Sequence, residues 1–186
     1  MREEELRKVT IGKIEPVDGP IGIREYDAAW PVLFEREAIR IRSVLGKQVL
    51  NLEHVGSTSV PGLAAKPKID ILLVVRDTAD EPAYVPRLEA AGYVLRIREP
   101  HWHEHRMFRG PDTDINLHCF SEGCSEIRRM LTFRNWLRTN ERDRALYERT
   151  KRELAARTWK YMQDYADAKT SIVEEILARA EERVQS

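Results

Sequence analysis

The residues best suited to chemistry begin with a short turn, Gly56-Ser57-Thr58-Ser59, that follows a strand-like segment. A turn of this kind exposes backbone N–H groups, which hold phosphate oxygens well. Gly56 lets a ligand approach the backbone closely because it has no Cβ atom. The three hydroxyls that follow can donate further hydrogen bonds. The turn predicts a phosphate-binding loop, with an ordinary loop between two strands as the alternative.

Two lysines and an aspartate follow this turn. Lys66 and Lys68 would place positive charge beside bound phosphates, and Asp70 would hold a divalent cation that bridges them. Asp70 also interrupts an apolar strand, and a carboxylate buried there without a partner is costly. The aspartate therefore favours a ligand site over an ordinary loop.

Histidines recur on the later strands of the predicted sheet. His101, His103 and His105 alternate, so in a strand they would share one face, where they could bind zinc or another transition metal. A polar strand end or a rim facing the ligand is the alternative, in which His105 and Arg106 donate to phosphate. His118 is interpreted either as a buried core histidine or as a general base that lines the pocket.

Basic residues on the later helical segments are candidates to reach the same site. Arg134 and Arg138 are four residues apart and share one helical face, and Lys169 lies on the last predicted helix. Most charges of this region are expected to form a solvated face with intrahelical ion pairs. Cys119 and Cys124 are expected to be free, buried thiols.

The elements that must position these residues follow from the periodicity of the apolar side chains. A helix is predicted to begin after Asp27, a good N-cap, and to end at Gly46. The segment Ile69–Val75 is apolar on both faces, which favours a strand inside the sheet. Other strands are predicted over residues 49–55, 93–97, 106–109 and 115–120, with a short helix over residues 84–91. Three helical segments follow from Ser125.

The chain of 186 residues has the length of one domain. We expect an N-terminal extended arm over residues 1–22, an α/β core over residues 23–120 and a helical part over residues 125–183. The predicted fold class is therefore α/β: a mixed β-sheet flanked by helices, with a helical C-terminal region.

The composition limits the partners. Lysine and arginine number 31, as do aspartate and glutamate, so no overall charge attracts a long polyanion. Nucleic acid is therefore not expected, whereas a small anion held by a local basic cluster is. No signal peptide or long apolar segment is evident, and two cysteines form no disulfide framework. We expect a cytoplasmic protein with no membrane partner; the sequence does not specify its oligomeric state.

The run from His54 to Ile71, H-V-G-S-T-S-V-P-G-L-A-A-K-P-K-I-D-I, closely resembles the signature of the GrpB family, also called UPF0157. The resemblance covers roughly residues 23–180. Residues 26–31 resemble the family's opening helix, and residues 105–108, 116–120, 133–138 and 165–169 resemble its later blocks. The family is grouped with the nucleotidyltransferase superfamily, similar in core fold to polymerase-β-like enzymes. A related domain is fused to dephospho-CoA kinase in some bacteria.

The resemblance implies a transfer reaction. In that superfamily a Gly-Ser pair binds a nucleoside triphosphate, an Asp-x-Asp pair holds magnesium, and a third acid lies on a nearby strand. By resemblance, Gly56 and Ser57 would bind the triphosphate, and Asp70 would be the first carboxylate.

The chain departs from this pattern at both remaining acids. Leu72 stands where the second acid is expected, and Asn116 and His118 occupy the strand expected to carry the third. A two-magnesium mechanism needs carboxylates that bridge both ions, and Asp70 alone does not provide them. Glu53, on the preceding strand, is a candidate for a second oxygen ligand.

Two functional hypotheses follow. The first is nucleotidyl transfer from a nucleoside triphosphate, or a related phosphorylated small molecule, to a small acceptor, with magnesium at Asp70 and Glu53. Its catalytic residues are Asp70 and His118. Its phosphate contacts are Gly56, Ser57, Thr58, Ser59, Lys66, Lys68, His105, Arg106, Asn116, Arg134 and Lys169. The second hypothesis is a non-catalytic module that binds a nucleotide or a CoA-like ligand and has lost the other metal acids.

Overall fold

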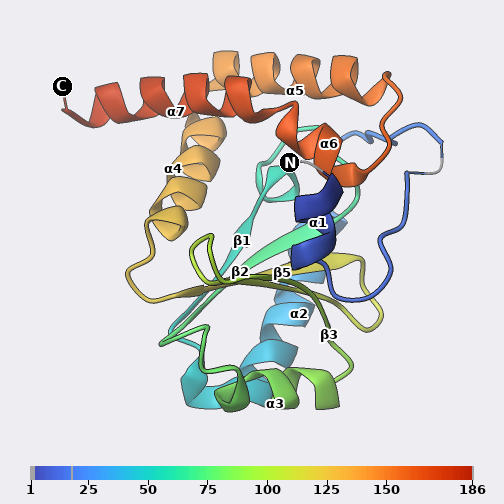
Figure 1. Ribbon diagram of the computed structural model, residues 1–186. Helices are drawn as coiled ribbons and strands as arrows, with labels where there is room; N and C mark the ends of the chain where they lie inside the picture. Colours follow the sequence, from blue (N-terminus) through green and yellow to red (C-terminus); the bar gives the residue numbers. More distant parts are fainter. Residues whose placement is uncertain (1–2, 18, 186) are drawn as a thin grey trace.

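A five-stranded mixed β-sheet divides the molecule into two helical layers (Figure 1). The computed structural model describes residues 3–17 and 19–185. The sheet order is β1-β2-β5-β4-β3; β2 and β5 are parallel, and the other neighbours are antiparallel. The strands are β1 Asn51–Val55, β2 Ile69–Val75, β3 Val94–Glu99, β4 His105–Arg109 and β5 Ile115–Ser121. The expected fold, a mixed sheet flanked by helices, is confirmed.

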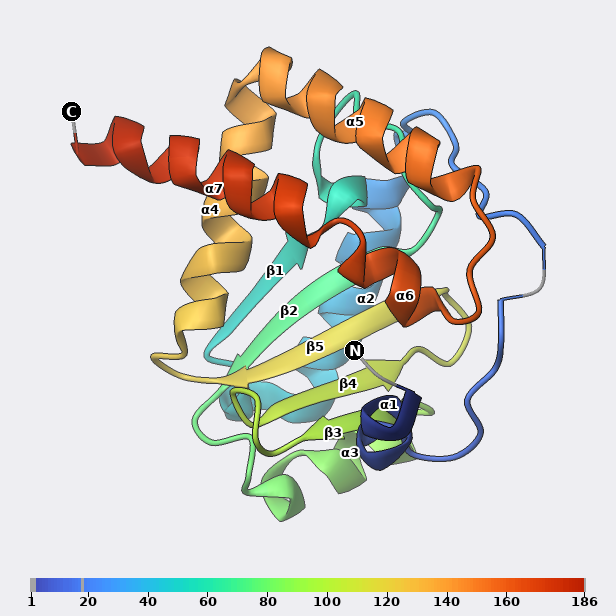
Figure 2. The ribbon, with the colours of Figure 1, turned by 45° about the horizontal axis from the view of Figure 1, so that its top comes forward.

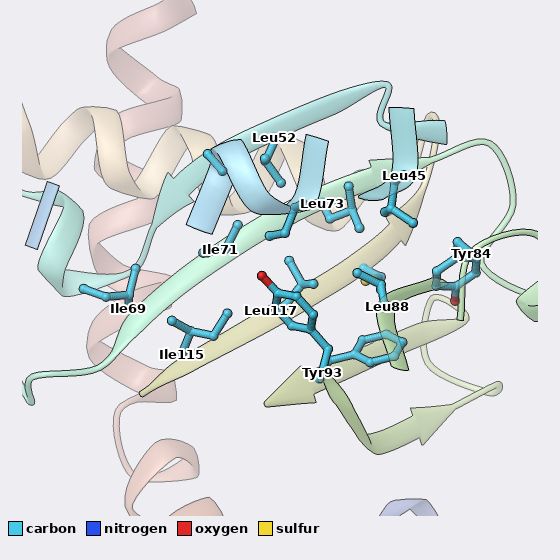
Figure 3. Packing of buried hydrophobic residues seen from close by; sticks show 14 of the residues in the cluster. Leu45, Leu52, Ile69, Ile71, Leu73, Tyr84, Leu88, Tyr93, Ile115 and Leu117 are labelled. Carbon is cyan, nitrogen blue, oxygen red and sulfur yellow. The ribbon is translucent and has the colours of Figure 1, made fainter. Parts of the chain in front are cut away.

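The main hydrophobic core lies on the face of the sheet covered by α2, Ala29–Leu45, and α3, Val85–Ala90 (Figure 1). The N-cap of α2 is Ala28, one residue after the predicted Asp27, whose side chain accepts a hydrogen bond from the Ala29 amide at 2.8 Å. Gly46 ends the helix at a φ of 55°, a value that favours glycine. Figure 3 shows leucines and isoleucines of the sheet meeting Leu45 and Leu88 of the two helices.

The opposite face of the sheet lies under the remaining helices (Figure 2). These helices are α1 Glu3–Val9, α4 Ser125–Thr139, α5 Glu141–Ala155, α6 Met162–Asp167 and α7 Thr170–Gln185. A smaller apolar cluster joins β1, β2 and β5 to the start of α4. Among the described helices, none is long and apolar enough to cross a membrane.

The N-terminal segment differs from the extended arm that the sequence predicted, because residues 3–9 form α1. Two ion pairs at a spacing of four residues, Arg7–Glu3 and Lys8–Glu4, support this helix. Leu6 is buried, and the residue that follows the helix, Thr10, forms a β-bridge with Ile97 of β3. The last predicted helix also differs, because it is divided into α6 and α7 at Ala168 and Lys169.

Candidate functional site

The strand register places the polar residues of β2 and β5 on the helical face covered by α4 to α7. Asp70 is paired with Asn116, and Leu72 is paired with His118. Because side chains alternate along a strand, all four project to the same side of the sheet. Leu72 is fully buried in the apolar cluster below α4, so its position contributes packing and no ligand atom. The polar site therefore consists of Asp70, Asn116 and His118.

Asp70 faces the glycine turn, as the phosphate-loop hypothesis requires. A Cβ atom added to Gly56, whose φ is 69°, would lie 2.9 Å from the Asp70 Cβ and closer still to Oδ2. Asp70 Oδ1 accepts a hydrogen bond from Asn116 Nδ2 at 2.8 Å and lies 3.6 Å from His118 Nε2. Burial acts to raise the pKa of Asp70, but His118 and Asn116 outweigh it, so the pKa is lowered.

A chain of side chains runs from Asp70 across the sheet to β3. The His118 Nδ1 lies 3.1 Å from His105 Nε2, and His105 Nδ1 lies 2.6 Å from Glu99 Oε2. Burial lowers the pKa of His105, which favours its neutral form. A neutral His105 donates from Nδ1 to Glu99 and accepts at Nε2 from His118. The Nε2 atom of His118 then faces Asp70. When the ring is protonated, its Nε2 proton points at the carboxylate and lowers the pKa of Asp70; when the ring is neutral, Nε2 carries a lone pair that can accept a proton.

Three lysines, Lys66, Lys151 and Lys169, lie close together beside this carboxylate and the turn. Burial, reinforced by repulsion from Lys169, lowers the pKa of Lys66 to about 8 and that of Lys151 to about 7. Lys151 is 2% exposed and donates to the Ala64 carbonyl at 2.5 Å. Among the described residues, none of the three lysines forms an ion pair with a carboxylate. The charge of Asp70 acts on Lys66 and offsets part of the positive charge of the cluster. The positive charge that remains makes the cluster suited to bind an added anion.

Tyrosines form the wall behind the lysines. Tyr147 lies beside Ser57, which acts to lower the pKa of the phenol, but burial outweighs this and raises it to about 12. The Lys151 ammonium lies 4.9 Å from the centre of the Tyr147 ring, and the Lys169 ammonium lies 4.6 Å from that of Tyr165. These cation–π contacts stabilise the lysine heads without neutralising their charge.

Tyr147, Lys151 and Glu99 belong to the site but were not predicted from the sequence. One signal was present: Tyr147, Lys151 and Leu154 have helical spacing, so a lysine occupies the apolar stripe of α5. Glu99 carried no such signal. Its contact with His105 arises only when β3 pairs with β4.

Two hydroxyls predicted to bind phosphate are used within the protein. The Thr58 hydroxyl is buried between His54 Nε2, at 3.0 Å, and the Lys68 carbonyl. The Ser59 hydroxyl donates to the Gly56 carbonyl at 2.6 Å. Both therefore hold the shape of the turn, which leaves Ser57 as the remaining hydroxyl of the turn for a ligand.

Arg106 and Lys68 are engaged away from the site. Adjacent residues of a strand point to opposite faces, so Arg106 lies on the α2–α3 side, where it binds Glu81 at 2.6 Å. This corrects the expectation that His105 and Arg106 both reach the ligand. Lys68 forms an ion pair with Asp114.

Arg134 and Glu53 are bound to each other. Arg134 donates to Glu53 Oε2 at 2.7 Å and to the His54 carbonyl at 2.8 Å, which ties α4 to β1. Glu53 therefore has an arginine as its partner, where a second magnesium ligand was expected. The zinc site considered for His101, His103 and His105 is not formed either. Among the described residues, no three histidine, cysteine or acidic side chains are placed so that they could hold one metal ion.

The remaining oxygen donors fit one magnesium ion and not two. Magnesium is commonly held by one or two carboxylates, with water and substrate phosphates completing its shell. Asp70 provides one carboxylate, and the Asn116 Oδ1 atom beside it is buried without a hydrogen-bond partner. With Leu72 apolar and Glu53 paired, the carboxylates needed to bridge two ions are missing.

Comparison with known proteins agrees with the family resemblance of the residues around the turn. A family model described as GrpB protein matches residues 20–179. The chain belongs to the GrpB family. A UPF0157 protein of Halalkalibacterium halodurans is 65% identical over 178 residues, which cover 96% of this chain and 91% of that protein.

A solved structure shares the fold of this GrpB chain. The crystal structure of the conserved protein GrpB from Enterococcus faecalis is 32% identical, with a TM-score of 0.75. The match covers 89% of this chain and 100% of that one. A dephospho-CoA kinase of Mycolicibacterium paratuberculosis is 28% identical over 164 residues, which are 74% of this chain and 40% of that protein.

Proposed function

We propose that this GrpB chain binds a nucleoside triphosphate, or a related phosphorylated small molecule, and transfers a nucleotidyl group to a small acceptor. The observation that carries the proposal is the lysine cluster, defined as Lys66, Lys151 and Lys169. Its members lack carboxylate ion-pair partners among the described residues and adjoin the turn and Asp70. Partly buried positive charge beside a glycine turn suits phosphate oxygens.

In the proposed complex the phosphates lie against the backbone of the turn and the Ser57 hydroxyl. The lysine cluster neutralises their charge and stabilises the pyrophosphate that leaves. A magnesium ion at Asp70 and Asn116 would supply further positive charge when bound. Buried Lys151 would keep its proton in this complex, because a bound anion raises the pKa of a neighbouring amine.

His118 is the proposed proton acceptor for the transfer step. Its Nε2 takes a proton from the acceptor's hydroxyl or neutral amine, while the oxygen or nitrogen forms a bond to the α-phosphorus. The bond from that phosphorus to the bridging oxygen of the β-phosphate breaks, and pyrophosphate leaves with the electron pair. Glu99 and His105 orient His118 through their hydrogen bonds, so they are positioning residues.

Thermal melting with ATP tests the binding step. Ligand at a hundred times its Kd should add about 2.7 kcal/mol to the free energy of unfolding, seen as a higher Tm. Lys151→Met and Lys169→Met should each reduce this shift, whereas Lys47→Met, at an exposed position outside the site, should not. A shift that is the same in all three variants, or no shift with any nucleoside triphosphate, would contradict the proposal.

The second candidate is a module that binds a nucleotide or a CoA-like ligand without catalysis. Buried Leu72 and the Glu53–Arg134 ion pair support it, because both remove acids that a two-metal reaction uses. The partial match to a dephospho-CoA kinase supports a CoA-like ligand. Pyrophosphate release with a panel of hydroxyl and amine acceptors separates the two candidates. Asp70→Asn should abolish release and any magnesium-dependent rise in Tm if the chain is a transferase.

A further inference from the structure

A second hollow on the same face of the sheet adjoins the site through His118. This groove, of about 1340 Å³, opens over β3, β4 and β5 and is bounded by α1, α4, α6 and α7. Figure 2 shows these four helices around that part of the sheet. His105 and His118 line the groove, whereas Ser57, Asp70 and the lysine cluster do not. His118 therefore contacts both the groove and Asp70.

Aromatic rings form the floor of the groove. His105 stacks on Phe120 with ring centres 4.8 Å apart, and Trp102 meets both rings edge-on at 5.4 and 6.0 Å. Trp102 is 44% exposed, so much of its ring is open to a ligand. The apolar lining continues with Leu6, Val9, Ile97, Met130 and Leu177. Such a surface suits a flat apolar molecule.

The charge of the groove is opposite to that of the lysine cluster. Its lining includes no lysine, two arginines and five carboxylates, from Glu99, Glu126, Asp167, Glu174 and Glu181. One of the arginines, Arg129, is bound to both Glu126 and Glu174. The groove therefore disfavours a phosphate and favours a ligand with positive charge.

We infer that this groove binds the acceptor, a small molecule with a flat apolar body and a protonated amine. The name acceptor rests on the proposed function, but the binding of such a molecule does not. The phosphorylated ligand and the acceptor would occupy separate hollows of opposite charge. The carboxylates of the groove would hold the ammonium group, while a hydroxyl or a second, neutral amine of the acceptor would lie at His118 as the nucleophile. A phosphorylated acceptor is excluded by this arrangement of charges.

Two matched probes test the inference. 2-Phenylethylamine and phenylacetate share a phenyl ring and differ in the sign of their charge. In NMR titrations of the full chain, the amine should shift the Trp102 indole N–H and the Met130 methyl signals, with a Kd at least tenfold below that of the carboxylate. Ala178→Phe, at an exposed position of α7 that lines the groove, should weaken amine binding at least tenfold. Ala90→Phe, exposed on α3 across the sheet, should not.

The outcomes separate this inference from the proposed function. If neither probe shifts Trp102 and Met130, or if phenylacetate binds as tightly as the amine, the groove is not an amine site. A titration with ATP on the same sample reports on the Gly56 and Ser57 amides. ATP binding without amine binding overturns this inference alone, and the reverse overturns the proposed function alone.

Discussion

At the scale of single residues, Gly56 is the position where a side chain does most harm. Its φ of 69° and its contact with Asp70 both require glycine. Gly56→Ala should lower the free energy of unfolding by about 1–3 kcal/mol and weaken ATP binding by displacing Asp70. Urea unfolding and ATP titration measure the two effects.

The matched control for this substitution is Gly62→Ala in the same loop. Gly62 has a φ of 77°, but nothing lies within 4 Å of its added Cβ. It should share the backbone strain of the Gly56 variant without its effect on Asp70. Equal loss of ATP affinity in both variants would show that the contact with Asp70 has no role.

The tautomer of His118 is the second prediction at this scale. The hydrogen bonds from Glu99 through His105 require a proton on His118 Nδ1, so the neutral ring has its lone pair on Nε2. The ¹⁵N shifts of the imidazole should show this tautomer in the free protein. Glu99→Gln, which keeps an acceptor oxygen, should preserve it, whereas Glu99→Ala should not. A neutral His118 ring with its proton on Nε2 in the unaltered protein would contradict the proposed orientation.

The depressed lysine pKa values predict opposite effects of pH on binding and stability. Lys66 and Lys151, with pKa values of about 8 and about 7, lose their charge as the pH rises through that range, so anion binding should weaken. Between pH 7 and the ordinary lysine pKa near 10.5, the unfolded chain binds more protons at Lys151 than the folded chain. The contribution of Lys151 to stability should therefore rise with pH over this window.

Urea unfolding and titrations with sulfate, whose charge is constant from pH 6 to pH 9, test the direction of both effects. Lys151→Met should remove most of the pH dependence of stability and part of that of binding. Sulfate binding that strengthens with rising pH would contradict anion binding by the charged lysines.

At the scale of elements, Asp143 holds three helices of the ligand-bearing layer together. It lies on α5 and accepts hydrogen bonds from Trp136 Nε1 of α4 at 2.7 Å and from Arg179 of α7 at 2.8 Å. Because Asp143 is buried, Asp143→Ala should lower the free energy of unfolding by about 2 kcal/mol. Glu141→Ala, exposed on the first turn of the same helix, should change it little, and equal losses would contradict the role of Asp143.

The alternation of side chains along each strand determines which of the predicted residues face the candidate site. His105 and Arg106 are neighbours in sequence, yet the alternation of β4 sends one to the histidine chain and the other to Glu81. Because neighbouring residues of a strand point to opposite faces of the sheet, His105 and Arg106 do not face the same site. Arg134, by contrast, faces the sheet as the helical spacing suggested, but Glu53 and the His54 carbonyl bind its guanidinium.

At the scale of the whole molecule, the sheet separates a packed core from a face that carries polar sites. The two faces differ because α2 and α3 cover one with apolar residues, whereas α4 to α7 leave hollows over the other. The apolar cluster around Leu72 is the exception on the polar face. It joins the start of α4 to the sheet, whereas a separate apolar cluster joins α4, α5 and α7 to one another.

Leu72→Asp tests whether that position retains the potential to bind metal. A carboxylate there would be buried beside Val55, Val74 and Phe120. We expect a loss of about 4 kcal/mol in the free energy of unfolding, with no gain in magnesium affinity. Leu72→Met, a change of similar volume, should cost less than about 1.5 kcal/mol. A stable Leu72→Asp variant that binds magnesium more tightly would contradict this interpretation.

Local patterns along the chain were enough to predict the strand Ile69–Val75, the helix after Asp27 and the facing pair of Gly56 and Asp70. These features depend on periodicity, on cap chemistry and on one acid in an apolar strand, all of which can be read from neighbouring residues. Other features emerged only in the folded molecule: Lys151 and Tyr147 join the site, Glu99 orients His118, and Arg134 neutralises Glu53. These contacts depend on strand register and on helix packing, which bring together residues that are far apart in the sequence.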